Sequence, residues 1–156
     1  MSASVLALEP SPNICNAISR SLINASRGGE EKRVSVKCIA AASVGGVSVL
    51  HCPGTETASL GEGGPVAGSC APDVEVPVTA LDELVDLQGI DEIAVLKVDA
   101  EGGDFDVLRG AKNMLLSGRI RFIIFESALT YWKVQARQRP GKKPIELMAE
   151  VRLRLD

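Results

Sequence analysis

The sequence predicts one α/β domain with a largely parallel sheet flanked by helices, and three observations support this fold class. The 156-residue chain is 46% hydrophobic but only 3% aromatic, so Val, Leu, Ile and Ala must form the core, as is usual around parallel sheets. Short apolar runs alternate with segments of helical periodicity, which is typical of strand–helix repeats. Three of these runs end on an acid, at Glu9, Asp99 and Glu126. Because ligands bind beyond the carboxyl ends of such strands, these acids predict a site.

The N-terminal third is expected to form a strand, a helix and two more strands. The apolar run at residues 5–8 indicates a buried strand. Ser11 fits the N-cap of the helix that follows, and Pro12 fits its first helical position. Alternation at residues 34–39 predicts the next strand, and residues 47–50 are expected to form its hairpin partner.

A long connection leads to the C-terminal elements. Residues 53–73 are rich in Gly, Pro and Ser, which predicts a long loop, and loops of this length are often lids, binding loops or disordered segments. Residues 74–78 predict a short strand, and Pro77 places it at a sheet edge. Thr79 is expected to cap the short helix that follows.

The remaining elements follow from clear periodicity. Residues 93–98 and 120–125 are nearly continuous apolar runs, which predict strands buried on both faces. Between them, residues 104–117 carry apolar side chains at helical spacing and are followed by Gly118. This pattern predicts one amphipathic helix.

Charge is spread unevenly along the chain. Residues 73–106 contain eleven carboxylates and one base, whereas the chain turns basic after Glu126. We expect a domain over residues 1–130 and a basic segment, helical or disordered, over residues 131–156. A basic tail can contact phosphates or a membrane surface, although a solvated face is the more frequent outcome. The net charge of −3 does not point to nucleic acid, and no run of about 18 apolar residues predicts a membrane span.

The four cysteines form no C-x-x-C pair, so their spacing gives no support for a zinc site. We expect them to be mostly reduced, partly buried small side chains, and the protein to be cytoplasmic. His51, the single histidine, stands next to Cys52. A metal-ligand pair is one interpretation, and a residue at the rim of a strand or loop is the more frequent one.

Two groups of residues are candidates for chemistry. Glu9 ends the first strand, where a carboxylate commonly accepts hydrogen bonds from both hydroxyls of a ribose. A partner for the dipole of the following helix is an equally good interpretation. Lys97 and Asp99 share one face of a strand, and Glu101 follows before two glycines that permit a tight turn. An ion pair followed by a helix N-cap is the alternative for this second group.

Several segments together resemble the FkbM-type methyltransferases, a branch of the class I S-adenosylmethionine-dependent enzymes. The most specific is Lys-x-Asp-x-Glu-Gly, followed by Leu-Arg-Gly-Ala. The others are weaker singly, but they occur in the family's order. In this chain the matching segments are residues 7–12, 41–46, 78–82, 96–111 and 125–126.

The resemblance implies a Rossmann-like class I sheet, S-adenosylmethionine as cofactor, and methyl transfer to a hydroxyl oxygen of a small molecule or sugar. Glu9 would bind the ribose, and the turn from Ala41 to Ser43 would lie against adenine. Asp99 and Glu101 are the candidates to take the hydroxyl proton, with Lys97 orienting either, and Asp99 also stands in the cofactor region. No metal is implied, although Asp99 with Glu126 could bind a divalent cation.

The chain also departs from the family's pattern. No glycine-rich loop precedes Glu9, and the Asp usual after the Ala-x-Ser turn is Val44. We therefore expect a fold that lacks the family's first strand and its last strands, as in a truncated product. The alternative function is a non-catalytic remnant that binds a partner through exposed sheet edges.

Overall fold

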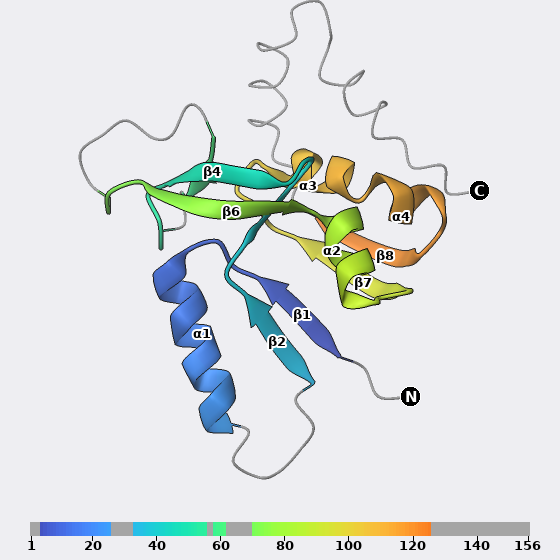
Figure 1. Ribbon diagram of the computed structural model, residues 1–156, viewed down its shortest axis with the longest axis horizontal. Coiled ribbons are helices and arrows are strands. Elements are labelled where there is room, and N and C mark those ends of the chain that lie inside the picture. Colours follow the sequence, from blue (N-terminus) through green and yellow to red (C-terminus); the bar gives the residue numbers. More distant parts are fainter. Residues whose placement is uncertain (1–3, 26–32, 56–57, 62–69, 126–156) are drawn as a thin grey trace, which may run out of the picture.

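The computed structural model describes residues 4–25, 33–55, 58–61 and 70–125, which form a mixed α/β structure (Figure 1). The N-terminal and C-terminal ends of this region are both strands. In chain order, the elements are β1 (Val5–Leu8), α1 (Pro12–Ala25), β2 (Val34–Lys37), β3 (Ala40–Ala42), β4 (Gly46–His51), β5 (Ser59–Leu60), β6 (Val74–Ala80), α2 (Leu81–Gln88), β7 (Ile93–Val98), α3 (Asp104–Gly110), α4 (Lys112–Leu116) and β8 (Ile120–Phe125).

The described strands form three small sheets. β1 pairs with β2 and β7 pairs with β8, both in parallel. The third sheet has the order β3-β6-β4-β5, with β3 parallel to β6 and the other pairs antiparallel. The α/β class is thus confirmed, but the strands are divided among three sheets where one continuous sheet was expected. The arrowheads of β1 and β7 point the same way in Figure 1.

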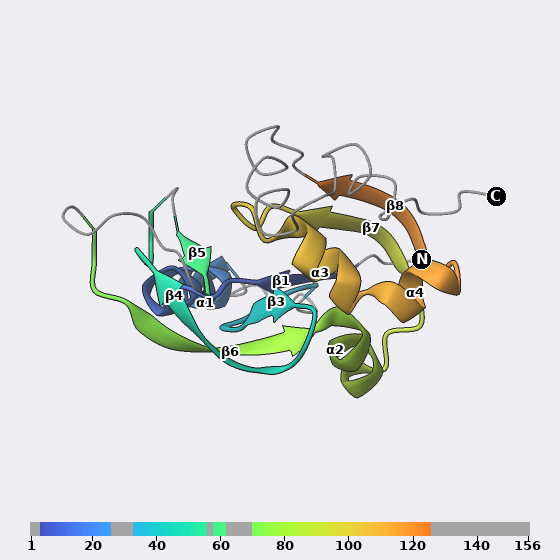
Figure 2. The same ribbon diagram turned by 90° about the horizontal axis from the view of Figure 1, so that it is seen from above.

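Helix α3 lies between the β7–β8 pair and the β3–β6 pair (Figure 2). Its apolar side chains form the main core together with residues of α2 and the end of β7. Apolar side chains from β1 and β3 pack against the same core. The buried members of this cluster are Leu81, Leu84, Val98, Phe105, Val107, Leu108 and Ala111.

Only one face of the β7–β8 pair is covered by the described residues. Leu96 and Ile123 pack against the core, whereas Val95, Phe122 and Ile124 are 55%, 67% and 58% exposed. The expectation that both strands are buried on both faces was therefore wrong. Composition alone cannot separate burial on one face from burial on two when every residue of a strand is apolar.

The pairing around β4 and β6 also differs from expectation. β4 pairs with β5 and β6, whereas β2, its expected hairpin partner, ends at Lys37 and pairs with β1. β6 lies inside its sheet, although Pro77 predicted an edge. The proline is accommodated because β3 is short and its ladder with β6 begins only at Val78. On the β3 side of β6, Pro77 therefore lies outside the ladder, so no hydrogen bond to β3 is lost through its missing N–H.

Two helix boundaries were predicted incorrectly. Thr79 is the penultimate residue of β6, and α2 begins after Ala80 with no side-chain cap. The single helix expected over residues 104–117 is divided into α3 and α4. The carboxylate of Asp82 explains the second start, because it accepts the N–H groups of Asn113 at 2.8 Å and Met114 at 3.0 Å. These N–H groups lie in the first turn of α4, so Asp82 caps that helix from α2.

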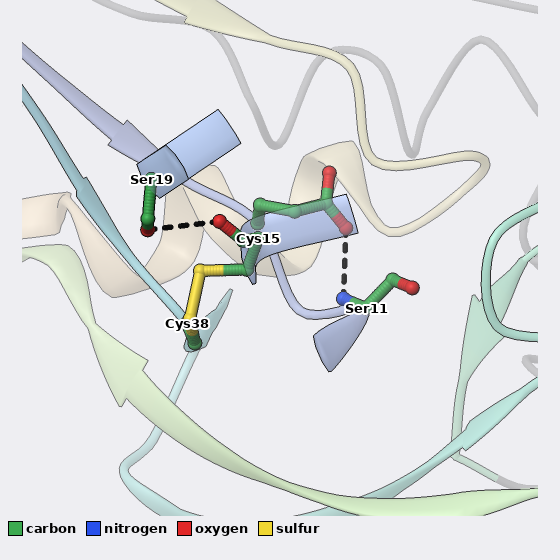
Figure 3. Close-up of a disulfide and its surroundings, with 5 residues drawn as sticks. Ser11, Cys15, Ser19 and Cys38 are labelled. Atoms are coloured by element: carbon green, nitrogen blue, oxygen red, sulfur yellow. Dashed lines mark hydrogen bonds between the residues drawn. A yellow bond between two sulfur atoms is a disulfide. The ribbon is translucent and has the colours of Figure 1, made fainter. Parts of the chain in front are cut away.

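All four cysteines are paired, so the expectation of mostly reduced thiols was wrong. One disulfide joins Cys15 of α1 to Cys38 after β2, and the other joins Cys52 to Cys70. Figure 3 shows the first of these beside the beginning of α1. The second closes the segment predicted as a plain loop, whose described part contains strand β5. Short-range motifs give no sign of these pairs, because each forms only when the fold brings distant residues together.

Candidate functional site

Glu9 stands directly after β1, as predicted, and its contacts fix the first turn of the site. Its N–H donates to the Lys37 carbonyl at 3.1 Å, which continues the β1–β2 ladder by one residue. One carboxylate oxygen, Oε1, accepts the Ser11 N–H at 2.7 Å. The other oxygen makes no hydrogen bond to the described part of the chain. Glu9 is half-buried, and its carboxylate is held in place through Oε1 alone among the described residues.

Ser11 precedes α1 at the expected position, but its hydroxyl does not cap the helix. The Oγ atom is buried and has no hydrogen-bond partner among the described residues, and the side chain is 2% exposed. A Cβ built on Gly54 would lie 3.8 Å from this oxygen, so the chain after β4 covers it. A buried hydroxyl without a partner costs free energy, which marks this position as one where a ligand or water can add a hydrogen bond.

The predicted adenine turn begins in β3 and leaves it at Ser43. Ala41 packs against the main core and is paired in register with Thr79 of β6. The Ser43 N–H donates to Oδ2 of Asp106 at 3.0 Å. Asp106 was not predicted as a site residue, although it lies four residues before Gly110 in the same helix. Residues four apart lie on one helix face, so this spacing was the sequence signal that could have placed Asp106 beside Gly110.

Lys97 and Asp99 lie on one face at the end of β7 and form an ion pair, with Nζ to Oδ2 at 2.7 Å. Both side chains are largely exposed, so water screens the pair strongly. Glu101 follows in a turn whose backbone is left-handed, with a φ of +46° at Glu101 and +95° at Gly102. The Gly103 N–H closes this turn by donating to the Ala100 carbonyl at 2.8 Å. A non-glycine residue held in the left-handed region is uncommon and often marks a functional turn.

The predicted site residues come from three strand ends that meet one core. Leu8, Ala41 and Ala100 all pack against the cluster around α3. Glu9 follows the first of these residues, and Asp99 and Glu101 flank the last. Glu126, the third predicted strand-end acid, lies outside the described residues.

His51 is a rim residue of β4, where it holds the neighbouring chain segments together. The ring donates a hydrogen bond to the Gly61 carbonyl through Nε2, and its Nδ1 lies 2.8 Å from Oδ2 of Asp73. These contacts raise the pKa of His51 above 6.5, and the bond to Gly61 contributes more than the bond to Asp73. A His51–Cys52 metal pair is ruled out because Cys52 is in a disulfide. Nowhere in the described ranges do three His, Cys, Asp or Glu residues gather as metal ligands.

The family comparison identifies the chain. Residues 1–155 match the model of the methyltransferase FkbM domain, so the chain belongs to the FkbM methyltransferase family. No curated protein and no solved structure matches the chain. In the described part of the chain, none of the helices has both the length and the apolarity needed to span a bilayer. Family membership supports methyl transfer as the general reaction.

Proposed function

We propose that this domain catalyses methyl transfer from S-adenosylmethionine to a hydroxyl oxygen of a small molecule or sugar. Membership of the FkbM family over residues 1–155 carries the proposal. The geometry around Glu9 supports it, because a half-buried carboxylate held by the Ser11 N–H lies at the end of a parallel strand. This is where ligands of α/β proteins commonly bind.

The residues present fit the ribose half of the cofactor. Oε1 of Glu9 is held by the Ser11 N–H, which leaves its second oxygen to accept a ribose hydroxyl. The turn that ends at Ser43 would lie against the adenine. We retain Glu9, Ala41, Ser43 and Asp99 as the proposed cofactor residues.

The proposed chemistry requires alignment and a proton acceptor. When bound, S-adenosylmethionine would supply a methyl group on a sulfonium and would leave as S-adenosylhomocysteine. The acceptor hydroxyl must lose its proton in this step, and Asp99 and Glu101 are the proposed bases. Lys97 contacts Asp99 directly and would hold that carboxylate in position. The chain's main contribution is to fix the two reacting centres relative to each other.

The compartment expected from the sequence, the cytoplasm, stays a prediction. The two disulfides favour an oxidising compartment, because cytosolic thiols are generally kept reduced. The division into a domain at residues 1–130 and a basic segment at 131–156 also stays a prediction, since residues beyond Phe125 lie outside the described ranges.

Thermal unfolding with increasing S-adenosylhomocysteine tests the function. A cooperative transition whose midpoint rises with ligand concentration is expected, because a ligand that binds only the native state stabilises it by mass action. A cooperative transition that is indifferent to the ligand would reject the cofactor assignment. Adenine alone, at matched concentrations, serves as the control for weak nonspecific binding.

A second candidate is a non-catalytic module that binds a partner through sheet edges. The observation in its favour is that, among the described residues, β1 pairs only with β2 and β7 only with β8. Within the described ranges, each of these two-stranded sheets is therefore extended by no further strand, and a sheet edge of this kind can accept an added strand. Analytical ultracentrifugation separates the two candidates. A monomer that binds S-adenosylhomocysteine favours the enzyme, and ligand-independent self-association favours the module.

A further inference from the structure

Helix α3 touches the turn after β3 at two points on one helix face. The carboxylate of Asp106 accepts the Ser43 N–H at 3.0 Å. One helical turn later, the backbone of Gly110 approaches β3 so closely that a built Cβ would lie 2.0 Å from the Ala42 carbonyl oxygen. Residues at this spacing share a helix face. The end of β3 is therefore held by a hydrogen bond and by direct backbone packing.

The other end of α3 is continuous with the turn that carries Asp99 and Glu101. The Gly103 carbonyl accepts the N–H groups of Asp106 at 2.9 Å and Val107 at 3.0 Å. The helix itself is anchored in the main core by its buried apolar side chains. A rigid helix thus links the turn with the proposed bases to the turn proposed to contact adenine.

We infer that Asp106 is a positioning residue that sets the adenine-side turn of the cofactor site. This inference rests on the proposed function. The bond from the Ser43 N–H ends on a charged oxygen, and such bonds are stronger than those between neutral groups. In this role Asp106 would act on the cofactor through the turn that it holds, so its loss would weaken binding by releasing that turn.

The remaining contact of Asp106 does not account for its position. Its Oδ1 faces the Arg109 guanidinium at 3.4 Å, and both side chains are more than 40% exposed. Exposed ion pairs of this kind contribute little to stability. The chain also contains a matched carboxylate, Asp82, which accepts two backbone N–H groups of α4 away from the turn. Asp82 also holds backbone N–H groups through its carboxylate, but at a place outside the proposed cofactor site, so it serves as the control.

The test measures the affinity of the purified full chain for S-adenosylhomocysteine by isothermal titration calorimetry. Asp106→Ala is expected to weaken binding roughly tenfold, the usual effect of losing a charge-assisted hydrogen bond. Asp106→Asn keeps an acceptor for the Ser43 N–H and should restore affinity to within about threefold of the wild type. Asp82→Ala should lower the thermal midpoint but leave the affinity of the folded protein within about twofold. If Asp106→Ala does not fold, Asp106→Glu, which keeps the charge and displaces the carboxylate, takes its place.

The outcomes separate this inference from the function on which it rests. Weaker binding in Asp106→Ala, recovery in Asp106→Asn and no change in Asp82→Ala would support the positioning role. Equal affinity in the wild type and the Asp106 variants, or an equal loss in Asp82→Ala, would overturn the inference alone. Failure of the wild type to bind would overturn the proposed function and the inference together. Amide exchange at Ser43 gives a readout without ligand, and unchanged protection in Asp106→Ala would also overturn the role.

Discussion

The α-carbon of Gly110 faces the carbonyl oxygen of Ala42, and a methyl group at residue 110 would lie 2.0 Å from that oxygen. It would also lie 3.3 Å from the α-carbon of Ala80. Both contacts are with strand backbone, which cannot turn aside as a flexible side chain can. The glycine of the Leu-Arg-Gly-Ala motif therefore permits a helix to pack directly against β3 and β6.

Gly110→Ala should destabilise the protein by at least about 2 kcal/mol, because overpacking against backbone forces a shift of the strand or the helix. Urea unfolding monitored by circular dichroism measures the loss. Gly45→Ala is the matched control. A Cβ there would meet the end of the Glu83 side chain at 2.9 Å, which can move away. Equal losses in the two variants would contradict the packing argument.

Glu9→Ala should weaken S-adenosylhomocysteine binding by about 1–3 kcal/mol, the usual cost of removing one partner from a buried polar group. Isothermal titration calorimetry provides the measurement. Glu92→Ala, which removes an exposed carboxylate paired with Arg121, should bind normally. Unchanged affinity in Glu9→Ala would reject Glu9 as the ribose ligand.

Glu101→Gly should be more stable than Glu101→Ala by about 1 kcal/mol. Both variants lose the carboxylate, but only glycine adopts a φ of +46° without steric cost. Thermal or urea unfolding compares the two directly. Methyl transfer should fall in both variants if the carboxylate is a base. A less stable glycine variant would show that the turn is not strained.

Protonated His51 should stabilise the described fold at acidic pH. Both ring nitrogens face acceptors, and together these acceptors raise the pKa of His51 above 6.5. The stabilisation is fully present below the unfolded value of 6.5 and is lost as the pH rises through the higher folded pKa. Unfolding free energies at pH 5–9 for the wild type and His51→Gln should therefore differ most at the acidic end.

The single histidine makes the titration directly observable. Proton NMR of the imidazole should give a pKa above 6.5 in the folded protein. Asp73→Asn removes the second contribution, from the side chain at Nδ1, and should lower that pKa. A folded pKa at or below 6.5 in the wild type would contradict the arrangement around the ring.

Removing the Cys15–Cys38 disulfide should cost roughly 3 kcal/mol, as expected for closing a loop of this length. Urea unfolding of the double variant Cys15→Ser/Cys38→Ser provides the test, with Cys52→Ser/Cys70→Ser as the companion. Alkylation of the unfolded wild type before reduction, read by mass spectrometry, checks the pairing itself. Modification of any thiol under those conditions would contradict full pairing.

The elements with strong local signals were predicted well. Strand β1, helix α1 and strands β7 and β8 stand where apolar runs and helical spacing indicated them. The boundaries that failed depend on distant partners. Pro77 predicted an edge strand, but β6 lies inside its sheet because the short strand β3 pairs with it only from Val78 onward. The helix expected over residues 104–117 divides because Asp82, outside that window, caps its second part.

The candidate site was only partly predictable, for the same reason. Glu9, Lys97, Asp99 and Glu101 could be selected because each stands at or next to the end of an apolar run. Asp106 lies inside helix α3 and not at the end of an apolar run, and its partner lies 63 residues earlier in the chain, so its spacing from Gly110 was the one local signal for it. The disulfides were missed because four cysteines permit three pairings and their spacing favours none.

The connectivity of the disulfides has a consequence for how the chain matures. Each bridge joins neighbours in sequence order, with separations of 23 and 18 residues, so the two covalent loops neither nest nor interlock. Either bridge can therefore close without waiting for the other. The two remaining pairings would give interlocked or nested loops that both include the segment between Cys38 and Cys52, which contains β3 and β4. During synthesis, the N-terminal bridge can form before the C-terminal half of the chain has emerged, which makes the native pairing the one favoured by order of synthesis.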